Sequence, residues 1–390
     1  MSIDFDEPVD RRGTDCLKWD ATGRFVGIEG DDVLSMWIAD TDFRAPDVVR
    51  QALRKITDFG VFGYGVRLEA MREALRWWMR HRHDWEVSEE AILTSDGLGN
   101  AIALVIDTLT EPGDGVVTFT PVYHEFAAKI RRAERRPVEV PLLVEDGRQS
   151  FDLDRAASML DGSEKLLLLC SPQNPGGRVW TEDELRAVAA FAEAHDLWVV
   201  ADEIHHDLVL PGARFRPMAA VGGIEDRLIT LVAPSKTFNL AGLRLGQMVI
   251  EDDALRGRIT KRISSLDIQP NMMGVAACAA AYSEAGAAWL DAQIAYIDAN
   301  RRVFDAGINT IPGARSTPLE ATYLAWVDFS GTGLSHAEVE ERVIERARIA
   351  VNNGTSFGPG GERHMRFNIG TQRNHVENAV ARLAAAFEGA

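Results

Sequence analysis

The chain has 390 residues, which is more than one ordinary hydrophobic core contains, so we expect two domains. A hydrophobic content of 46% and a charged content of 26% are typical of a soluble globular protein. The formal net charge of −17 argues against nucleic acid or an anionic membrane as the main partner.

The N-terminus is acidic and has no apolar stretch, so it does not resemble a secretory signal. No window reaches the roughly 18 apolar residues that a membrane span requires. Cys16, Cys170 and Cys278 stand far apart and indicate neither a disulfide framework nor a zinc site. We therefore expect a protein of the reducing cytoplasm.

The first 45 residues are irregular and rich in turns, and we expect residues 1–45 to form an arm that packs with a small domain in the C-terminal part of the chain. The stretch 68–83 has the pattern of an amphipathic helix and ends in "HRHDW" at 81–85. A metal site is one interpretation of these histidines, but cations are common in a last helical turn, and we predict no metal. Trp77 and Trp78 are expected in the core or at an interface.

Short apolar runs alternate with amphipathic stretches in the middle of the chain. Four runs predict strands, at 115–120, 165–170, 197–202 and 227–232. Between the second and the third, Thr181 and Glu184 form a capping-box pattern at the start of a predicted helix over 181–196. Strands that are apolar throughout and alternate with helices indicate an α/β fold, with a mostly parallel sheet covered on both faces.

The pattern changes near residue 281. It predicts one long helix over 285–311, a strand within 321–329, a helix over 336–347, a strand over 364–369 and a terminal helix over 375–390. This is a smaller α+β unit. We expect a large domain over 46–280 and a small C-terminal domain over 281–390.

Polar residues follow the predicted strands, where open parallel sheets bind their ligands. These residues are Tyr123, Asn174, Asp202, His205 and Lys236, and an upstream segment places Gly97 and Gly99 where a helix should begin. A helix N-terminus suits a phosphate, a carboxylate suits a pyridine nitrogen, and a lysine amine condenses with an aldehyde to a Schiff base. Pyridoxal 5'-phosphate carries all three groups on a flat ring, so the pattern favours this cofactor.

The same residues carry a family resemblance. The order of Tyr123, Asn174-Pro175-Gly176, Asp202, Lys236, Arg244 and Arg366 resembles the class I/II aminotransferase family, fold type I of the pyridoxal-phosphate enzymes, over nearly the whole chain. Four further segments, at 36–46, 60–64, 202–210 and 233–243, resemble the MalY/PatB branch of cystathionine β-lyases and C–S lyases. The resemblance implies a large cofactor-binding domain with a seven-stranded type of sheet, a small C-terminal domain and a homodimer with shared active sites.

Each role that the resemblance implies has a structural alternative. Lys236 would hold the cofactor and remove the substrate Cα proton; otherwise it is a surface lysine at a strand end. Asp202 would pair with the pyridine N–H, or cap a helix. Asn174 would reach the ring's 3-oxygen and the substrate, or cap a turn. Tyr123 would stack on the ring, or belong to the core. His205 would adjoin the cofactor, or be a hydrogen-bonded histidine near a helix start.

The resemblance places the cofactor phosphate at the backbone of Gly97, Leu98 and Gly99. Arg244 would supply the opposite charge, and the alternative for the glycines is an ordinary turn. The segment is not a dinucleotide fingerprint, since Ile102 occupies the last glycine position. The family often has a serine where this chain has Ala233, so Ser235 is the hydroxyl left to contact the phosphate.

The substrate would be a small amino acid. Arg366 matches the arginine that binds its α-carboxylate, because a guanidinium fork fits both oxygens; the alternative is a surface arginine on an edge strand. Tyr64 would reach the phosphate of the neighbouring subunit and also the substrate. Trp37 and Ala39 would line the mouth of the substrate site.

Four functions follow from these patterns. The first is β-elimination from L-cystathionine or related S-substituted cysteines to a thiol, pyruvate and ammonia, with a place in sulfur amino acid and methionine metabolism. The second is transamination, which begins with the same removal of the Cα proton. The third is a cofactor-bearing regulatory protein that binds a partner. The fourth, a nicotinamide-dependent dehydrogenase, is disfavoured by the missing fingerprint.

Overall fold

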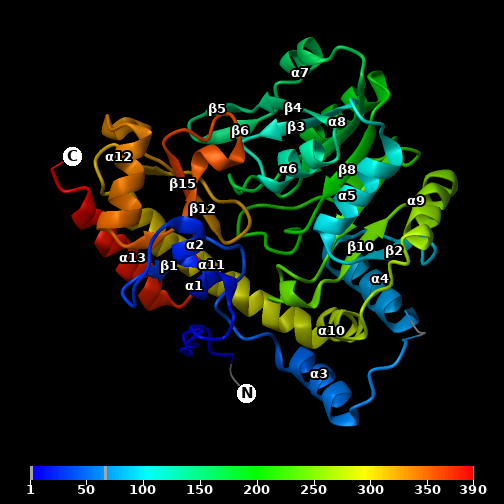
Figure 1. Cartoon of the computed structure of the whole chain (residues 1–390), viewed down its shortest axis with the longest axis horizontal. Coiled ribbons are helices and arrows are strands. Elements are labelled where there is room, and N and C mark those ends of the chain that lie inside the picture. Colours follow the sequence, from blue (N-terminus) through cyan, green and yellow to red (C-terminus); the bar gives the residue numbers. More distant parts are fainter. Residues whose placement is uncertain (1–2, 66–67, 390) are drawn as a thin grey trace.

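A seven-stranded sheet forms the centre of the larger part of the protein, as a computed structural model that describes residues 3–65 and 68–389 shows (Figure 1). Its strands, in spatial order, are β2 (Ile92–Ser95), β10 (Gly246–Val249), β9 (Leu228–Val232), β8 (Trp198–Asp202), β7 (Glu164–Cys170), β3 (Gly115–Thr120) and β4 (Arg136–Pro141). Only β10 runs antiparallel to its neighbours in this sheet. The predicted α/β fold, its mostly parallel sheet and all four predicted strands are confirmed.

Alternate residues of each strand face opposite sides of this sheet. On β7, Leu166 and Leu168 pack with one hydrophobic cluster while Leu167 and Leu169 pack with another. Helices α5 (Leu98–Leu109), α6 (Glu125–Arg132) and α9 (Asp253–Ser265) cover the first face, and α7 (Leu153–Met159) and α8 (Glu182–Ala194) cover the second. Helix α8 begins with the capping box predicted from Thr181 and Glu184. Burial on both faces explains why the inner strands of this sheet are apolar over most of their length.

A second, antiparallel sheet lies in the C-terminal part. Its order is β11 (Arg315–Ser316), β12 (Leu324–Asp328), β15 (His364–Asn368) and β14 (Asn352–Asn353). Helices α11 (Glu284–Ile308) and α13 (Arg373–Ala386) pack against each other beside it (Figure 1). The long helix, the two strands and the terminal helix are therefore present as predicted, although residue 390 of the terminal helix prediction lies outside the described residues.

One predicted helix is wound differently. Residues 336–347 form a short α-helix, α12 (His336–Glu340), which continues as a π-helix, η4 (Glu341–Arg346). Val339 and Val343 are buried four residues apart, and this spacing suits both windings. The apolar pattern therefore indicated a helix without distinguishing the wider turn from the regular one.

The segment before residue 46 is less irregular than expected. It contains α1 (Leu17–Asp20), α2 (Thr22–Val26) and β1 (Leu34–Ser35), and β1 pairs in parallel with β13 (Ile349–Ala350). Figure 1 shows this blue segment beside α11 and α13. Helices α3 (Asp47–Phe59), α4 (Glu69–His83) and α10 (Met272–Ala281) pack together at the other end, and β5 (Leu143–Glu145) and β6 (Arg148–Ser150) form a hairpin.

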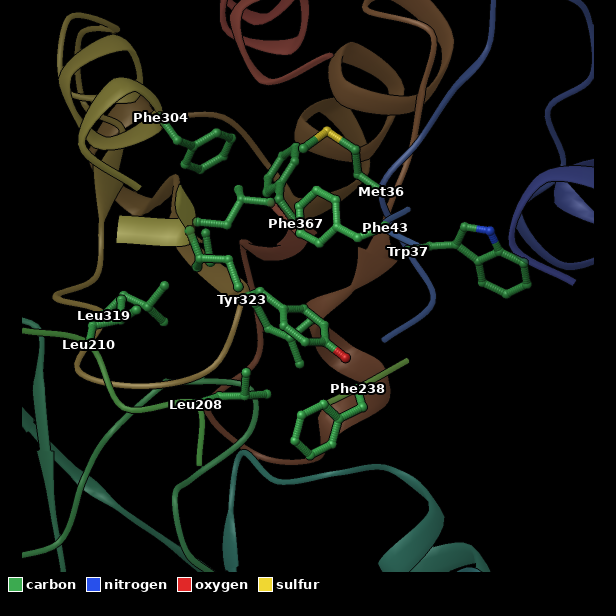
Figure 2. Close-up of a cluster of buried hydrophobic side chains, with 14 of the residues drawn as sticks. Met36, Trp37, Phe43, Leu208, Leu210, Phe238, Phe304, Leu319, Tyr323 and Phe367 are labelled. Atoms are coloured by element: carbon green, nitrogen blue, oxygen red, sulfur yellow. The ribbon is translucent and has the colours of Figure 1, made fainter. Parts of the chain in front are cut away.

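The largest hydrophobic cluster contains residues from the N-terminal segment, from 46–280 and from 281–390. Figure 2 shows part of it, with Phe43 beside Phe367 and with Tyr323 and Phe238 nearby. The ranges 1–45, 46–280 and 281–390 therefore share one core, and we keep them as a proposed division into an arm, a large domain and a small domain. No helix among the described residues has both the length and the apolar character to cross a membrane.

Candidate active site

A cavity of about 650 Å³ opens at the carboxyl ends of the parallel strands. Most of the site residues predicted from the sequence line it: Ala39, Gly97, Leu98, Gly99, Tyr123, Asn174, Asp202, His205, Ser235, Lys236 and Arg244. Except for Ala39, which belongs to the N-terminal segment, they lie at the ends of β2, β3, β7, β8 and β9 or in the segments that follow, so the sheet edge brings them together. Tyr64, Trp37 and Arg366 do not line this cavity.

Lys236 follows β9 and is partly buried against the N-terminal segment. Its Nζ donates a hydrogen bond to the backbone oxygen of Ala39 at 2.6 Å. Burial lowers the pKa of the Lys236 amine to about 8, and the positive charge of Arg366 acts in the same direction, although Asp40 and Asp202 oppose it. A neutral amine, which is the form that can attack an aldehyde or accept a proton, is therefore accessible near physiological pH.

Asp202 is the last residue of β8 and is buried at the floor of the cavity. Its Oδ1 accepts a hydrogen bond from the Ile204 amide at 3.2 Å. Burial raises the pKa of its carboxyl group to about 6, against the lowering effects of the Ile204 amide and the Lys236 charge. A carboxylate in this environment gains from an N–H donor that carries positive charge.

Arg366, on β15, is buried directly behind Asn174. Its Nη1 donates to Asn174 Oδ1 at 2.9 Å, and its Nη2 donates to the Trp37 backbone oxygen at 2.8 Å and to Asn352 Oδ1 at 2.6 Å. The guanidinium lies over the Phe357 ring, 4.9 Å from its centroid. Burial lowers the pKa of Arg366 to about 10, and its Nε has no hydrogen-bond partner among the described residues.

The loop between β2 and α5 ends at Gly97, which caps α5 with a φ of 83°. A side chain would be strained in this left-handed conformation. The amides of Asn100 and Ala101 both donate to the Gly97 oxygen, whereas the amides at the start of a helix have no partner within it. Gly99 faces Lys129, because a Cβ added to Gly99 would lie 3.5 Å from Lys129 Nζ. An ammonium group therefore adjoins the positive end of the helix dipole.

Lys129 and Glu125 were missed from the sequence, although both line the cavity. They lie on α6 and form an ion pair at 3.0 Å. Their spacing of four residues, just after Tyr123, puts both on one helix face, and this was the available signal. Tyr323 was also missed; its hydroxyl donates to the Ala39 oxygen at 3.0 Å, and no local pattern points to that contact.

Trp37 and Tyr64 lie elsewhere. The Trp37 indole is buried and donates to the Lys18 backbone oxygen at 2.8 Å, and Figure 2 shows its ring turned away from Tyr323 and Phe367. Trp37 meets the site through its backbone oxygen, which holds Arg366. Tyr64 is fully exposed beyond the end of α3. His205 does line the cavity, with its Nδ1 unpartnered among the described residues, and burial keeps the pKa of its ring well below the usual value.

Comparison with known proteins assigns the chain to a family. The model of the family "Aminotransferase class I and II" matches residues 32–383. The chain belongs to the class I and II aminotransferases. Within this family it is 37% identical over 388 residues to the cystathionine β-lyase PatB of Bacillus subtilis (strain 168), which covers 98% of this chain and 100% of that protein.

Solved structures agree with this assignment to the family. The pyridoxal-phosphate-containing cystalysin of Treponema denticola superposes with a TM-score of 0.94 at 33% identity, covering 100% of this chain and 99% of that one. The aromatic aminotransferase of Pyrococcus horikoshii OT3 superposes with a TM-score of 0.84 at 26% identity, covering 92% and 96%. The chain is thus more similar to PatB and to cystalysin than to this aromatic aminotransferase.

The residues around the cavity fit pyridoxal phosphate, the cofactor of this family. The buried Asp202 carboxylate has one amide donor and suits a pyridinium N–H, while the Lys236 amine with its lowered pKa suits the aldehyde. The start of α5, with Lys129 beside it, suits a dianionic phosphate. The expected cofactor is therefore confirmed by the family and matched by the chemistry of the donors.

Proposed function

We propose that the chain is a pyridoxal-phosphate-dependent carbon–sulfur β-lyase, with L-cystathionine or a related S-substituted cysteine as its substrate. The products would be a thiol, pyruvate and ammonia, with one water consumed for each substrate cleaved. The full-length identity of 37% to a cystathionine β-lyase carries this proposal. It is supported by a cavity in which a lysine of lowered pKa lies on the same floor as a buried carboxylate.

The bound cofactor supplies a ring that accepts the electron pair released when the substrate loses its Cα proton. Lys236 Nζ takes this proton, because burial lowers the pKa of its amine to about 8 and so raises the fraction that is neutral. Asp202 holds a proton on the pyridine nitrogen through a charge-assisted hydrogen bond. The thiolate then leaves from Cβ, and water converts the remaining carbon skeleton to pyruvate and ammonia.

The other cavity residues position the cofactor. The amides of Gly97, Leu98 and Gly99 bind its phosphate, together with Arg244 and Ser235. We add Lys129 to this set because of its place beside Gly99. Tyr123 would stack on the ring, and His205, which lines the same cavity, would adjoin it.

Arg366 binds the substrate α-carboxylate, with Asn174 between it and the cofactor. Its unpartnered Nε and its desolvated position suit a carboxylate more than a neutral group. Asn174 Oδ1 already accepts from Arg366, which leaves its amide N–H groups for the ring's 3-oxygen or the substrate. Ala39 lines the adjoining mouth, whereas Trp37 acts only through its backbone oxygen, which holds Arg366.

We further propose a homodimer. The segment at the end of α3 exposes four large side chains, and apolar patches of this kind mark interaction surfaces. These residues are Phe59, Val61, Phe62 and Tyr64. A second copy of the chain would cover them and would bring Tyr64 to the partner's phosphate site. The three cysteines are free, and we propose the cytoplasm as the location.

A substrate panel tests the lyase. Purified protein with added cofactor is given cystathionine, cystine or alanine, with and without a keto acid, and pyruvate, ammonia and new amino acid are measured. A lyase releases pyruvate and ammonia in equal amounts from cystathionine without a keto acid. A transaminase forms new amino acid only when the keto acid is present. A regulatory cofactor carrier does neither at a useful rate.

Borohydride reduction tests the role of Lys236. Peptide mapping should find the reduced cofactor on Lys236, and Lys129→Ala should still be labelled because Lys129 contacts the phosphate end alone. Labelling of Lys129 instead, or of neither lysine, contradicts the assignment.

A further inference from the structure

A second cluster of metal-binding side chains lies outside the active-site cavity. His83 ends α4, while His206 and Asp207 lie in the turn that follows β8. One ligand atom from each residue lies within 4.8 Å of the others. The three residues line a separate cavity of about 350 Å³ that the active site does not share.

The His206 ring presents a free nitrogen to this cluster. Its Nδ1 lies 2.6 Å from the Glu203 backbone oxygen, and a carbonyl only accepts, so Nδ1 carries the proton. Its Nε2 lies 3.3 Å from Asp207 Oδ2 but makes no hydrogen bond with any described residue. His206 is fully buried, so water outside the protein does not solvate this nitrogen. Two electron-pair acceptors thus face each other, an arrangement that a cation between them stabilises.

Asp207 is held in place from behind. Trp78 Nε1 donates to its Oδ1 and the Thr237 hydroxyl donates to its Oδ2, each at 2.8 Å. His83 Nε2 lies 2.8 Å from Oδ1. Since each carboxylate oxygen has two lone pairs, one on each oxygen remains directed to the histidines. Ligands oriented in this way by a carbonyl, an indole and a hydroxyl are typical of metal sites.

We propose that His83 Nε2, His206 Nε2 and the Asp207 carboxylate bind one divalent transition-metal ion of the zinc type. Two imidazoles and a carboxylate are ligands that this ion favours, and all three residues line the adjoining cavity. On binding, the proton of His83 moves from Nε2 to Nδ1, so a neutral ring ligates without net proton loss. The ion also balances the negative charge of the buried Asp207 carboxylate.

Positive side chains line the same cavity, and two of them are already paired. Arg82 lies 2.8 Å from Asp291, and Arg216 lies 3.6 Å from Glu182. Arg214 also lines the cavity. These pairs lower the repulsion that a cation meets at the entrance.

The site reaches the active site through one residue. Thr237, which donates to Asp207, directly follows Lys236 in the chain. A bound ion would therefore fix the turn that carries Lys236, as well as joining α4 to the segment after β8. Its main effect is on stability, because an ion that binds the folded protein and not the unfolded chain raises the free energy of unfolding.

Metal titration of the cofactor-loaded protein tests the proposal. After dialysis against a chelator, Co²⁺ is added and its visible absorption is followed, and Zn²⁺ is titrated calorimetrically. We expect one ion to bind per chain, with the visible absorption of a Co²⁺ ion that has a low coordination number. Zn²⁺ should displace Co²⁺, and the melting temperature of the protein should rise. Absence of stoichiometric binding overturns the proposal.

Matched variants locate the ion. His83→Gln should abolish the cobalt spectrum and the thermal shift. The loss of metal affinity should exceed the roughly 10- to 100-fold that results when a residue hydrogen-bonded to a ligand is replaced. His81→Gln, on the same helix but stacked on Trp77 and exposed, removes a histidine without touching the cluster and should bind as the wild type does. His83 is near the cavity wall, so its variant should fold even if His206→Gln does not. Equal binding by His83→Gln contradicts this site.

Discussion

Replacement of Arg366 by alanine tests the small-domain side of the proposed active site. Arg366 is 3% exposed, so a substrate carboxylate bound to its guanidinium is removed from water. An ion pair at the surface, by contrast, contributes at most about 1 kcal/mol. Loss of one member of a buried, hydrogen-bonded charge pair costs roughly 2–5 kcal/mol. Because about 1.4 kcal/mol corresponds to a factor of ten, kcat/KM for cystathionine should fall by roughly 30- to 4000-fold.

The loss should lie mainly in KM. The carboxylate is bound alike in the ground state and in the transition state, and removal of such uniform binding leaves kcat nearly unchanged. Steady-state kinetics of pyruvate release measure both constants. Arg366→Lys should recover part of the affinity, since a point charge cannot form the fork. Arg363→Ala removes an exposed arginine three residues earlier and should behave as the wild type does.

The reasoning is refuted if folded Arg366→Ala keeps the wild-type KM. Folding is checked separately because Asn174 and Asn352 each lose a donor, and a buried acceptor without a partner costs about 1–3 kcal/mol. A change in kcat alone, with KM unaffected, would also contradict an anchoring role and would assign Arg366 to the chemistry.

Three other changes test the shared site, the N-terminal packing and the buried carboxylate. When Lys236→Ala and Tyr64→Phe dimers are mixed and exchange their subunits, activity should return, because one site of the mixed dimer carries both changes and the other carries neither. No recovery, once subunit exchange has been demonstrated, contradicts a shared site. Asp42→Ala should lower the free energy of unfolding in urea by about 3–5 kcal/mol, since the fully buried Lys18 loses the carboxylate 2.8 Å away; a smaller change than 1 kcal/mol contradicts this. In cofactor-free protein, Asp202 should make the free energy of unfolding fall as pH rises from 3.8 towards about 6, because its carboxyl group keeps its proton to a higher pH in the native state than in the unfolded state. Asp202→Asn should remove this dependence of stability on pH in denaturant titrations. An unchanged dependence contradicts the raised pKa of Asp202.

The central sheet could be predicted because its strands are buried on both faces. Runs such as 166–170 are apolar at every position, and capping residues such as Thr181 mark where the following helix begins. Pairings between distant segments have no such local signal. The antiparallel placement of β10 between β9 and β2, and the two-residue pairing of β1 with β13, follow from the tertiary structure alone.

The candidate site divides in the same way. Asn174, Asp202 and Lys236 were predictable as residues that follow parallel strands, since those strand ends share one edge. Arg366 came from the family resemblance and not from any pattern in the small domain. The contact of His83 with Asp207 joins positions 124 residues apart, so "HRHDW" alone gave no reason to expect it. Side chains whose partners come from distant segments are the part of a site that local patterns do not reveal.

The strip from Trp37 to Asp40 lies against β15. Arg366 holds the Trp37 oxygen, and Asn368 Nδ2 donates to the oxygens of both Ile38 and Asp40. The first of these contacts joins residues 329 positions apart, so a ribosome releases the strip long before its partner strand exists. Domains commonly fold in order during synthesis, but here the Ala39 oxygen that receives Lys236 is fixed only after β15 emerges. A truncated chain without β15 would therefore lack the side chains that hold the backbone on either side of Ala39.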